Sequence, residues 1–126
     1  MAGLRNREVS PLAFESVRAT VAAFLAIDDS WTNAAMRRLA QPIQGDPAIA
    51  AGASGAAALG GLLAATFAPG MQHVRERLGL HAGSRVLIIV SEGVTDRALW
   101  HEVTGGPVHH LVHRSPGEDG SAERDG

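Results

Sequence analysis

The sequence predicts an α/β fold with an incomplete sheet, because two short apolar segments alternate with capped helices. Residues 85–90, Arg-Val-Leu-Ile-Ile-Val, form a continuous run rich in β-branched side chains, which is typical of a strand buried on both faces of a parallel sheet. Residues 24–27, Phe-Leu-Ala-Ile, form a second apolar segment that ends at two aspartates. Two strands do not make a stable parallel sheet. We therefore expect the other strands of this sheet to come from outside these 126 residues.

Helices are predicted around both segments from capping residues at their starts and from proline or glycine at their ends. The first begins at Ser10 and Pro11, because a serine side chain caps a helix and proline suits the first helical position. A helix at about 54–67 consists mostly of alanine and glycine, so it can approach a neighbouring backbone closely. The other helices are expected from Asp29 or Ser30 to Pro42, from Pro69 to Leu78 with Gly79 at its end, and from Thr95 or Asp96 to Gly105.

Composition excludes several classes of function. The chain has 11 basic and 13 acidic residues and no basic run, so it offers no electrostatic surface for nucleic acid. It has no cysteine, which removes disulfides, thiolate metal ligands and cysteine nucleophiles. All 11 basic residues are arginine, which cannot form a Schiff base. Whether genomic base composition or function explains the missing lysine, chemistry that needs a lysine must be supplied from elsewhere.

One uncharged stretch, residues 47–74, is long enough to span a bilayer. Most of it is alanine and glycine, and no basic cluster beside it sets an orientation, so a buried helix is the better interpretation. Residues 1–7 carry charge and lead into no secretory apolar core. We therefore expect a cytoplasmic protein that has no membrane partner.

The chain divides into a folded segment, residues 1–106, and a polar, glycine-rich tail, residues 107–126, which is expected to be disordered. His109, His110 and His113 lie at the start of this tail. A histidine pair spaced by four residues can bind a metal from a helix. No carboxylate is placed with these histidines, however, so no metal site is expected.

Two segments are candidates for contact with a small ligand. Ser91 is the first polar residue after 85–90, and Gly93 allows a tight turn there, where ligands collect in open α/β sheets. The alternative is that Ser91 only satisfies the end of the strand. Residues 52–55, Gly-Ala-Ser-Gly, begin a helix whose amides could face an anion, and the alternative is a plain helix cap. No catalytic acid–base pair is found, since Glu92 stands alone in the sequence.

Three motifs occur in a fixed order between residues 1 and 106. They are Met1-Ala2-Gly3-Leu4; Asp46-Pro47 followed by Gly52-Ala53-Ser54-Gly55-Ala56; and Ser91-Glu92-Gly93-Val94-Thr95-Asp96. They resemble Met-Ala-Gly-Leu, Asp-Pro with Gly-Glu-Ser-Gly-Ala, and Ser-Thr-Glu-Gly-Asp-Thr-Asp of the diaminopropionate ammonia-lyase family. The chain therefore resembles the C-terminal portion of a fold-type II enzyme that depends on pyridoxal 5′-phosphate (PLP).

The resemblance implies a three-layer αβα fold similar to the tryptophan synthase β chain, of which this chain holds an incomplete sheet. It also implies PLP as the cofactor, held by a lysine as a Schiff base, and β-elimination of 2,3-diaminopropionate to pyruvate and ammonia. In related enzymes a serine or threonine after the last strand hydrogen-bonds the pyridine nitrogen; the matching cofactor-binding positions here are Ser91 and Gly93. A neutral hydroxyl leaves that nitrogen largely unprotonated, which favours prompt loss of the leaving group over side reactions.

The sequence departs from the family pattern at polar positions. A Cys-Gly pair of the family is replaced by Asn6-Arg7, a glutamate by Ala53 and an aspartate by Val94. The PLP lysine and the phosphate-binding loop belong to the family's N-terminal portion, which these residues do not match. We therefore expect a truncated or decaying lyase that is inactive alone and contributes no catalytic residue.

Two functions follow as hypotheses. The chain is the C-terminal part of an ammonia-lyase that acts on a small amino-acid substrate only when a separate N-terminal half-enzyme supplies the lysine and the phosphate loop. A homodimer is the other partner expected. The alternative is a non-catalytic partner or assembly module that keeps the remnant of the fold.

Overall fold

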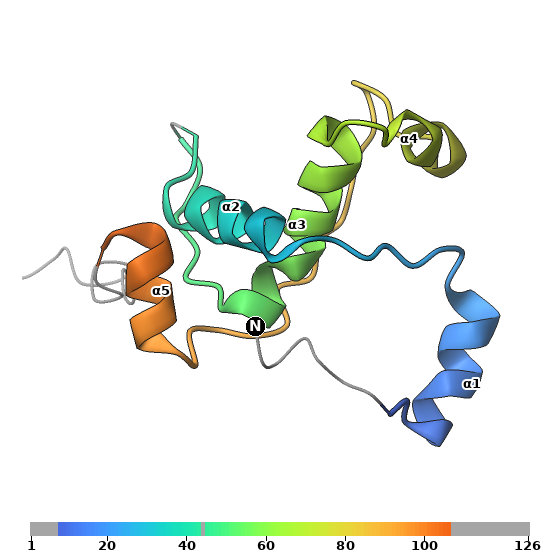
Figure 1. Cartoon of the computed structure of the whole chain (residues 1–126), viewed down its shortest axis with the longest axis horizontal. Helices are drawn as coiled ribbons and strands as arrows, with labels where there is room; N and C mark the ends of the chain where they lie inside the picture. The colour runs from blue at the N-terminus through green and yellow to red at the C-terminus, as the bar shows by residue number, and fades with distance from the viewer. Residues whose placement is uncertain (1–7, 44, 107–126) are drawn as a thin grey trace, which may run out of the picture.

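The computed structural model describes residues 8–43 and 45–106, and in these residues it is helical (Figure 1). Three helices, α2, α3 and α5, meet around a small core, while α4 extends from the far end of α3. The helices are α1 (Pro11–Thr20), α2 (Asp29–Ala40), α3 (Ala53–Phe67), α4 (Gln72–Leu78) and α5 (Arg97–Thr104).

The helix boundaries confirm the predictions made from capping residues to within a few positions. Ser10 caps α1 by accepting a hydrogen bond from the backbone of Ala13. Asp28 caps α2, one residue before the expected position, and its hydrogen bonds with the side chain and backbone of Ser30 hold the pKa of Asp28 below its usual value. Asp96 caps α5 through the Leu99 amide at 2.9 Å.

Glycine ends two of these helices as predicted. Gly79 follows α4 with φ of 64°, and Gly105 follows α5 with φ of 73°. Both values lie in the left-handed region, which glycine adopts without the steric cost that a Cβ would add.

The core is small and combines three alanines with two large side chains. Its buried members are Ala35, Met36, Ala51, Ala56 and Trp100. Helix α3 crosses the start of α2 so closely that a Cβ added at Gly60 would lie 3.1 Å from backbone atoms of Trp31 and Thr32. The prediction that an alanine- and glycine-rich helix packs against neighbouring backbone is confirmed.

Hydrogen bonds connect the helices at their ends. The side chain of Gln41, which follows α2, donates to the carbonyl of Thr104 at the end of α5, at 3.1 Å. The guanidinium of Arg75 in α4 donates to the carbonyls of Ala65 and Thr66 at the end of α3. A cation is favourable there because the C-terminus of a helix carries partial negative charge.

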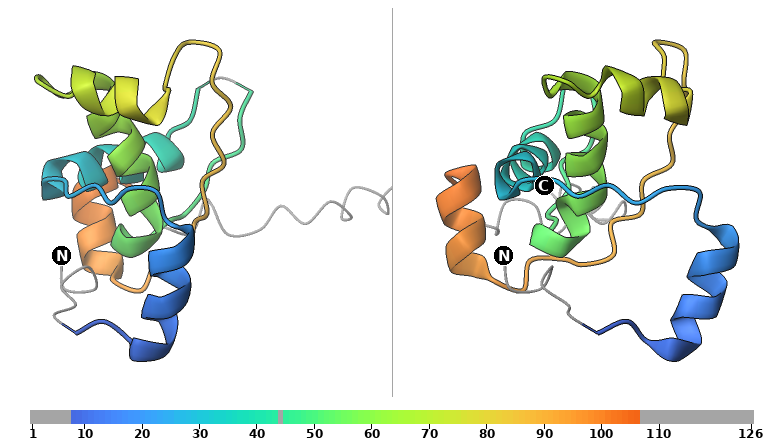
Figure 2. Two further views of the ribbon diagram at one scale, coloured as in Figure 1. Left: turned by 90° about the vertical axis from the view of Figure 1, so that its right-hand side faces the viewer. Right: turned by 45° about the vertical axis from the view of Figure 1, so that its right-hand side comes forward.

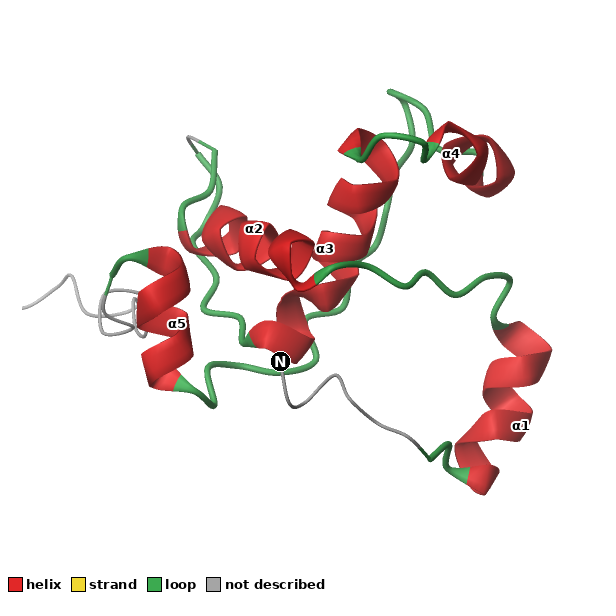
Figure 3. Ribbon diagram, viewed as in Figure 1, coloured by secondary structure: helices red, strands yellow, loops and turns green. Residues whose placement is uncertain are grey.

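The expected strands are absent from the described residues, so the α/β prediction is wrong for the structure of this part of the chain (Figure 3). Residues 24–27 and 85–90 run as extended or irregular chain without pairing. Within the described residues, no backbone hydrogen bond involves residues 85–91. The physical reason is that a strand exists only when a neighbouring strand takes up its N–H and C=O groups.

The side chains of the 85–90 segment remain accessible as well. Leu87 is 89% exposed and Ile89 is 72% exposed, whereas Ile88 between them is half-buried. This alternation is the one that a strand shows when a single face is covered. The apolar run therefore has the side-chain pattern of a strand but lacks the partners that would make it one.

Helix α1 stands apart from the other helices at the end of an extended segment, residues 21–28 (Figure 2). None of its residues is buried, and Leu12 is 89% exposed. The following segment also exposes apolar side chains, among them Phe24 at 79%.

No single helix within the described ranges is long and apolar enough to cross a membrane. Helices α3 and α4 together have the length and the apolar composition of a membrane span. The angle between them at the break is 115°, however.

Candidate cofactor-contact loop at the start of α3

The loop of residues 91–96 crosses the N-terminus of α3, so the structure brings the second and third sequence motifs together. The backbone amide of Gly52 donates a hydrogen bond to the carbonyl oxygen of Glu92 at 3.1 Å. A Cβ added at Gly52 would lie under 3.0 Å from the carbonyl oxygen of Gly93, and one added at Gly55 would meet the carbonyl oxygen of Glu92 in the same way. Glycine at both positions is therefore required for this contact.

The carboxylate of Glu92 also bonds to both sides of the junction. It accepts hydrogen bonds from the Thr95 hydroxyl, in its own loop, and from the Ser54 hydroxyl, in the first turn of α3. These bonds, that from Thr95 first, hold the pKa of Glu92 below its usual value. The negative charge lies at the positive end of the α3 dipole, which favours the ionised form.

These contacts decide between the alternatives for residues 52–55. The start of α3 is covered by Glu92 and Gly93, so its amides do not face an open anion site. The interpretation that this segment is a helix start with a structural role is the one that the geometry supports. The sequence did not predict the two hydroxyl partners of Glu92, and neither of them forms a catalytic acid–base pair with it.

Ser91 and Gly93 lie on the outer side of the loop. Both are exposed, and the Ser91 hydroxyl has no hydrogen-bond partner among the described residues. A Cβ added at Gly93 would meet nothing within 4 Å. An exposed, unpartnered hydroxyl beside open backbone fits a heterocycle that needs one hydrogen-bond donor or acceptor, as the pyridine ring of PLP does.

The chain is 40% identical over 112 residues to the diaminopropionate ammonia-lyases of Escherichia coli K12, O6:H1 and O157:H7. This chain is homologous to part of diaminopropionate ammonia-lyase. The match covers 89% of this chain and 28% of each relative, so the chain spans less than a third of the length of those enzymes. No protein-family model matches the chain, and no solved structure matches it.

The homology confirms the resemblance that the three motifs predicted. Ala53 and Val94 are the two positions at which the resemblance gives the lyase family an acidic residue. Both are partly buried and pack against the core of α2, α3 and α5.

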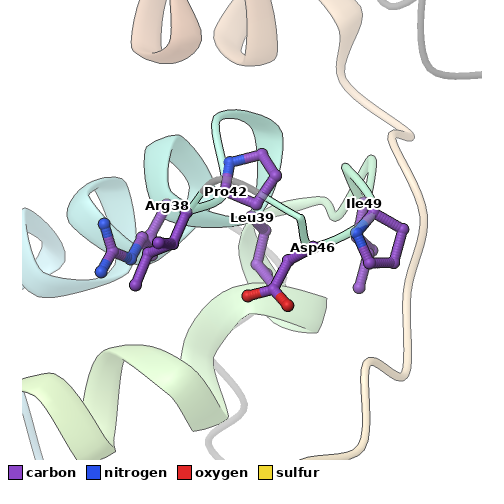
Figure 4. A pocket seen from close by; sticks show the side chains of 7 residues that line it. Arg38, Leu39, Pro42, Asp46 and Ile49 are labelled. Atoms are coloured by element: carbon purple, nitrogen blue, oxygen red, sulfur yellow. The ribbon is translucent and has the colours of Figure 1, made fainter.

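The structure also contains pockets that the sequence analysis did not anticipate. A shallow, mostly apolar pocket lies between the end of α2 and the following loop, where the charged ends of Arg38 and Asp46 are well separated (Figure 4). It is lined by Arg38, Leu39, Pro42, Ile43, Asp46, Pro47 and Ile49. Neither Ser91 nor Gly93 lines it, so the predicted cofactor-binding residues lie elsewhere.

No group of three or more histidine, aspartate or glutamate side chains that could hold a metal occurs in residues 8–43 and 45–106. The three histidines of the tail, His109, His110 and His113, lie outside the described residues, as does the expected tail itself.

Proposed function

We propose that this chain is the C-terminal portion of a PLP-dependent ammonia-lyase and that it contributes the contact to the cofactor ring nitrogen. The observation that carries the proposal is the 112-residue homology to diaminopropionate ammonia-lyase, which includes the loop of Ser91 and Gly93. The exposed and unpartnered hydroxyl of Ser91 supports it. The chain has no lysine, so a second polypeptide portion has to supply the covalent attachment.

PLP would supply the electron withdrawal that allows the α-proton and the β-amino group of 2,3-diaminopropionate to be lost. The Ser91 hydroxyl would hydrogen-bond the ring nitrogen as a neutral partner. Gly93 would let the loop approach the ring without a side chain between them. The substrate class is a small β-substituted amino acid, with 2,3-diaminopropionate as the first to test.

The missing portion would also complete the sheet. Among the residues that the structure describes, 85–91 form no backbone hydrogen bond. The high exposure of Leu87 and Ile89, with Val86 lining a pocket beside α3, suits a strand that has α3 on one face. We propose that strands of the lysine-bearing portion pair with this segment and that helices of that portion cover Leu87 and Ile89. The resulting architecture would be the three-layer αβα fold that the resemblance implies.

A complementation experiment tests this function. The N-terminal part of the E. coli K12 enzyme, up to the region homologous to this chain, is co-expressed with the full chain and supplied with PLP and 2,3-diaminopropionate. We expect release of two molecules of ammonia for each pyruvate, because the β-amino group leaves first and hydrolysis of the aminoacrylate product then releases the second nitrogen, and we expect no release from either part alone. A complex that forms, binds PLP and releases no pyruvate contradicts the proposal.

Matched serine variants identify the role of the loop in that assay. Ser91→Ala should lower the activity of the complex about tenfold, because the ring nitrogen loses its hydrogen-bond partner. Ser16→Ala, which removes an exposed hydroxyl from the remote helix α1, should leave the activity unchanged.

The second candidate function, a non-catalytic assembly module, is favoured by the open backbone of residues 85–91. It predicts that the chain binds the N-terminal part of the lyase through this segment and that the complex eliminates ammonia from no substrate. The same co-expression distinguishes the two functions, because both predict a complex and only the first predicts pyruvate.

A further inference from the structure

Glu92 is the first residue after the unpaired segment 85–91 that is attached to the helical core. Its carbonyl accepts from Gly52, and its carboxylate accepts from Ser54 and Thr95. Residues 85–91, which precede it, have no backbone hydrogen bond within the described residues. The position of Ser91 is therefore determined on one side only, by its covalent link to Glu92.

The attachment allows little freedom of placement. Gly52, just before α3, and Gly55, in its first turn, lie so close to the loop that a methyl group at either one would overlap the loop backbone. On the C-terminal side, Val94 packs against the core and Asp96 caps α5. The loop is thus held at Glu92, Val94 and Asp96, and the exposed residues Ser91 and Gly93 are direct neighbours of these attachments.

We propose that Glu92 is a positioning residue of the lyase site: by bonding to Ser54 and Thr95 it fixes the loop on α3 and so aims the Ser91 hydroxyl and the Gly93 backbone at the cofactor ring. This inference rests on the proposed function. Glu92 itself faces α3 and does not touch the cofactor; it acts through the loop that it holds.

The full chain, labelled with ¹⁵N, provides the first test without any cofactor. Hydrogen exchange of the Gly52 amide reports the bond between α3 and the loop, and the amides of Ala35 and Met36 in α2 report the stability of the core. We expect Glu92→Ala to accelerate exchange at Gly52 about tenfold and to shift the Ser91 and Gly93 amide resonances, with the α2 amides unchanged. Glu92→Gln keeps an acceptor for the hydroxyls and should restore most of the protection.

Control variants separate positioning from general stability. Thr95→Val removes one of the two hydroxyls and should accelerate exchange at Gly52 about threefold, whereas Thr95→Ser keeps the hydroxyl and should not. Glu76→Gln changes a carboxylate that accepts a hydrogen bond from the Gln72 side chain in α4, away from the loop, and it should leave the Gly52 amide unaffected. If Glu92→Ala prevents folding, the Thr95→Val and Thr95→Ser pair decides the question.

The second readout is the affinity for PLP of the complemented lyase. Glu92→Ala should weaken PLP binding about three- to tenfold, whereas the separate variant Glu92→Gln should bind PLP nearly as well as the wild type. Unchanged exchange at Gly52 in both Glu92→Ala and Thr95→Val, or unchanged PLP affinity in Glu92→Ala, overturns the positioning role. Failure of the wild-type complex to release pyruvate instead overturns the proposed function, and the exchange experiment still tests the attachment of the loop.

Discussion

Replacing Gly55 by alanine should destabilise the chain even though alanine favours helices. Gly55 lies in the first turn of α3, where an added Cβ would meet the Glu92 carbonyl oxygen under 3.0 Å, its carbonyl carbon at 3.0 Å and its nitrogen at 3.1 Å. All three are backbone atoms, so the overlap is relieved only if the loop moves. Overpacking of this kind costs roughly 1–3 kcal/mol, which exceeds the gain of up to about 1 kcal/mol from replacing glycine by alanine in a helix.

The matched control is Gly61→Ala in the same helix. An added Cβ at Gly61 would meet only the Leu25 side chain, at 3.8 Å, which is an ordinary contact. This variant should be more stable than the wild type by about 0.5–1 kcal/mol, because alanine loses less backbone entropy on folding.

Urea or thermal unfolding followed by circular dichroism measures both variants. Since 1 kcal/mol corresponds to roughly 4–8 °C in the melting temperature of a domain of 60–100 residues, the two variants should melt on opposite sides of the wild type. If Gly55→Ala is as stable as Gly61→Ala, the close seating of residues 91–93 on α3 is refuted.

Three further predictions follow from the same contacts. Because the pKa of Glu92 is lowered, its ionised form stabilises the fold fully above the ordinary glutamate pKa of 4.5, and this contribution is lost as the pH falls through the lowered pKa. Unfolding curves of the wild type and of Glu92→Gln should therefore converge in acid and separate at neutral pH. Val94→Asp places a charge in a partly buried position that packs against the core, and it should lower the free energy of unfolding in urea by about 1–3 kcal/mol. The control Leu87→Asp, at a position 89% exposed, should change that free energy by less than about 0.5 kcal/mol. Addition of PLP to the purified chain should give no absorption band of a lysine Schiff base, and a stable band of this kind would contradict the need for a second portion.

The helices could be predicted from the sequence because their ends depend on neighbouring residues. Ser10 and Asp96 bond to amides three residues away, and Gly79 ends a helix through its own φ angle. The small-residue character of α3 likewise predicted close packing, which Gly60 shows against α2. The motifs also predicted the homology to the lyase, since they record residue order.

The candidate loop could be predicted only in part. Ser91 and Gly93 were identified from their place after an apolar run, and they remain predicted cofactor contacts. The network around Glu92 was missed, although the Thr95 hydroxyl three residues along the chain was a local signal for half of it. The other half, the Ser54 hydroxyl, lies far away in the sequence and comes close only because α3 packs against the loop.

By itself the sequence determined what is local: helix caps and ends, the absence of lysine, and the family to which its motifs are related. Tertiary structure decided whether residues 85–90 form a strand and which groups Glu92 binds. The reason is physical: a helix satisfies its own backbone hydrogen bonds within four residues, whereas a strand or a loop carboxylate depends on groups that only the packed chain, or a second one, can place beside it.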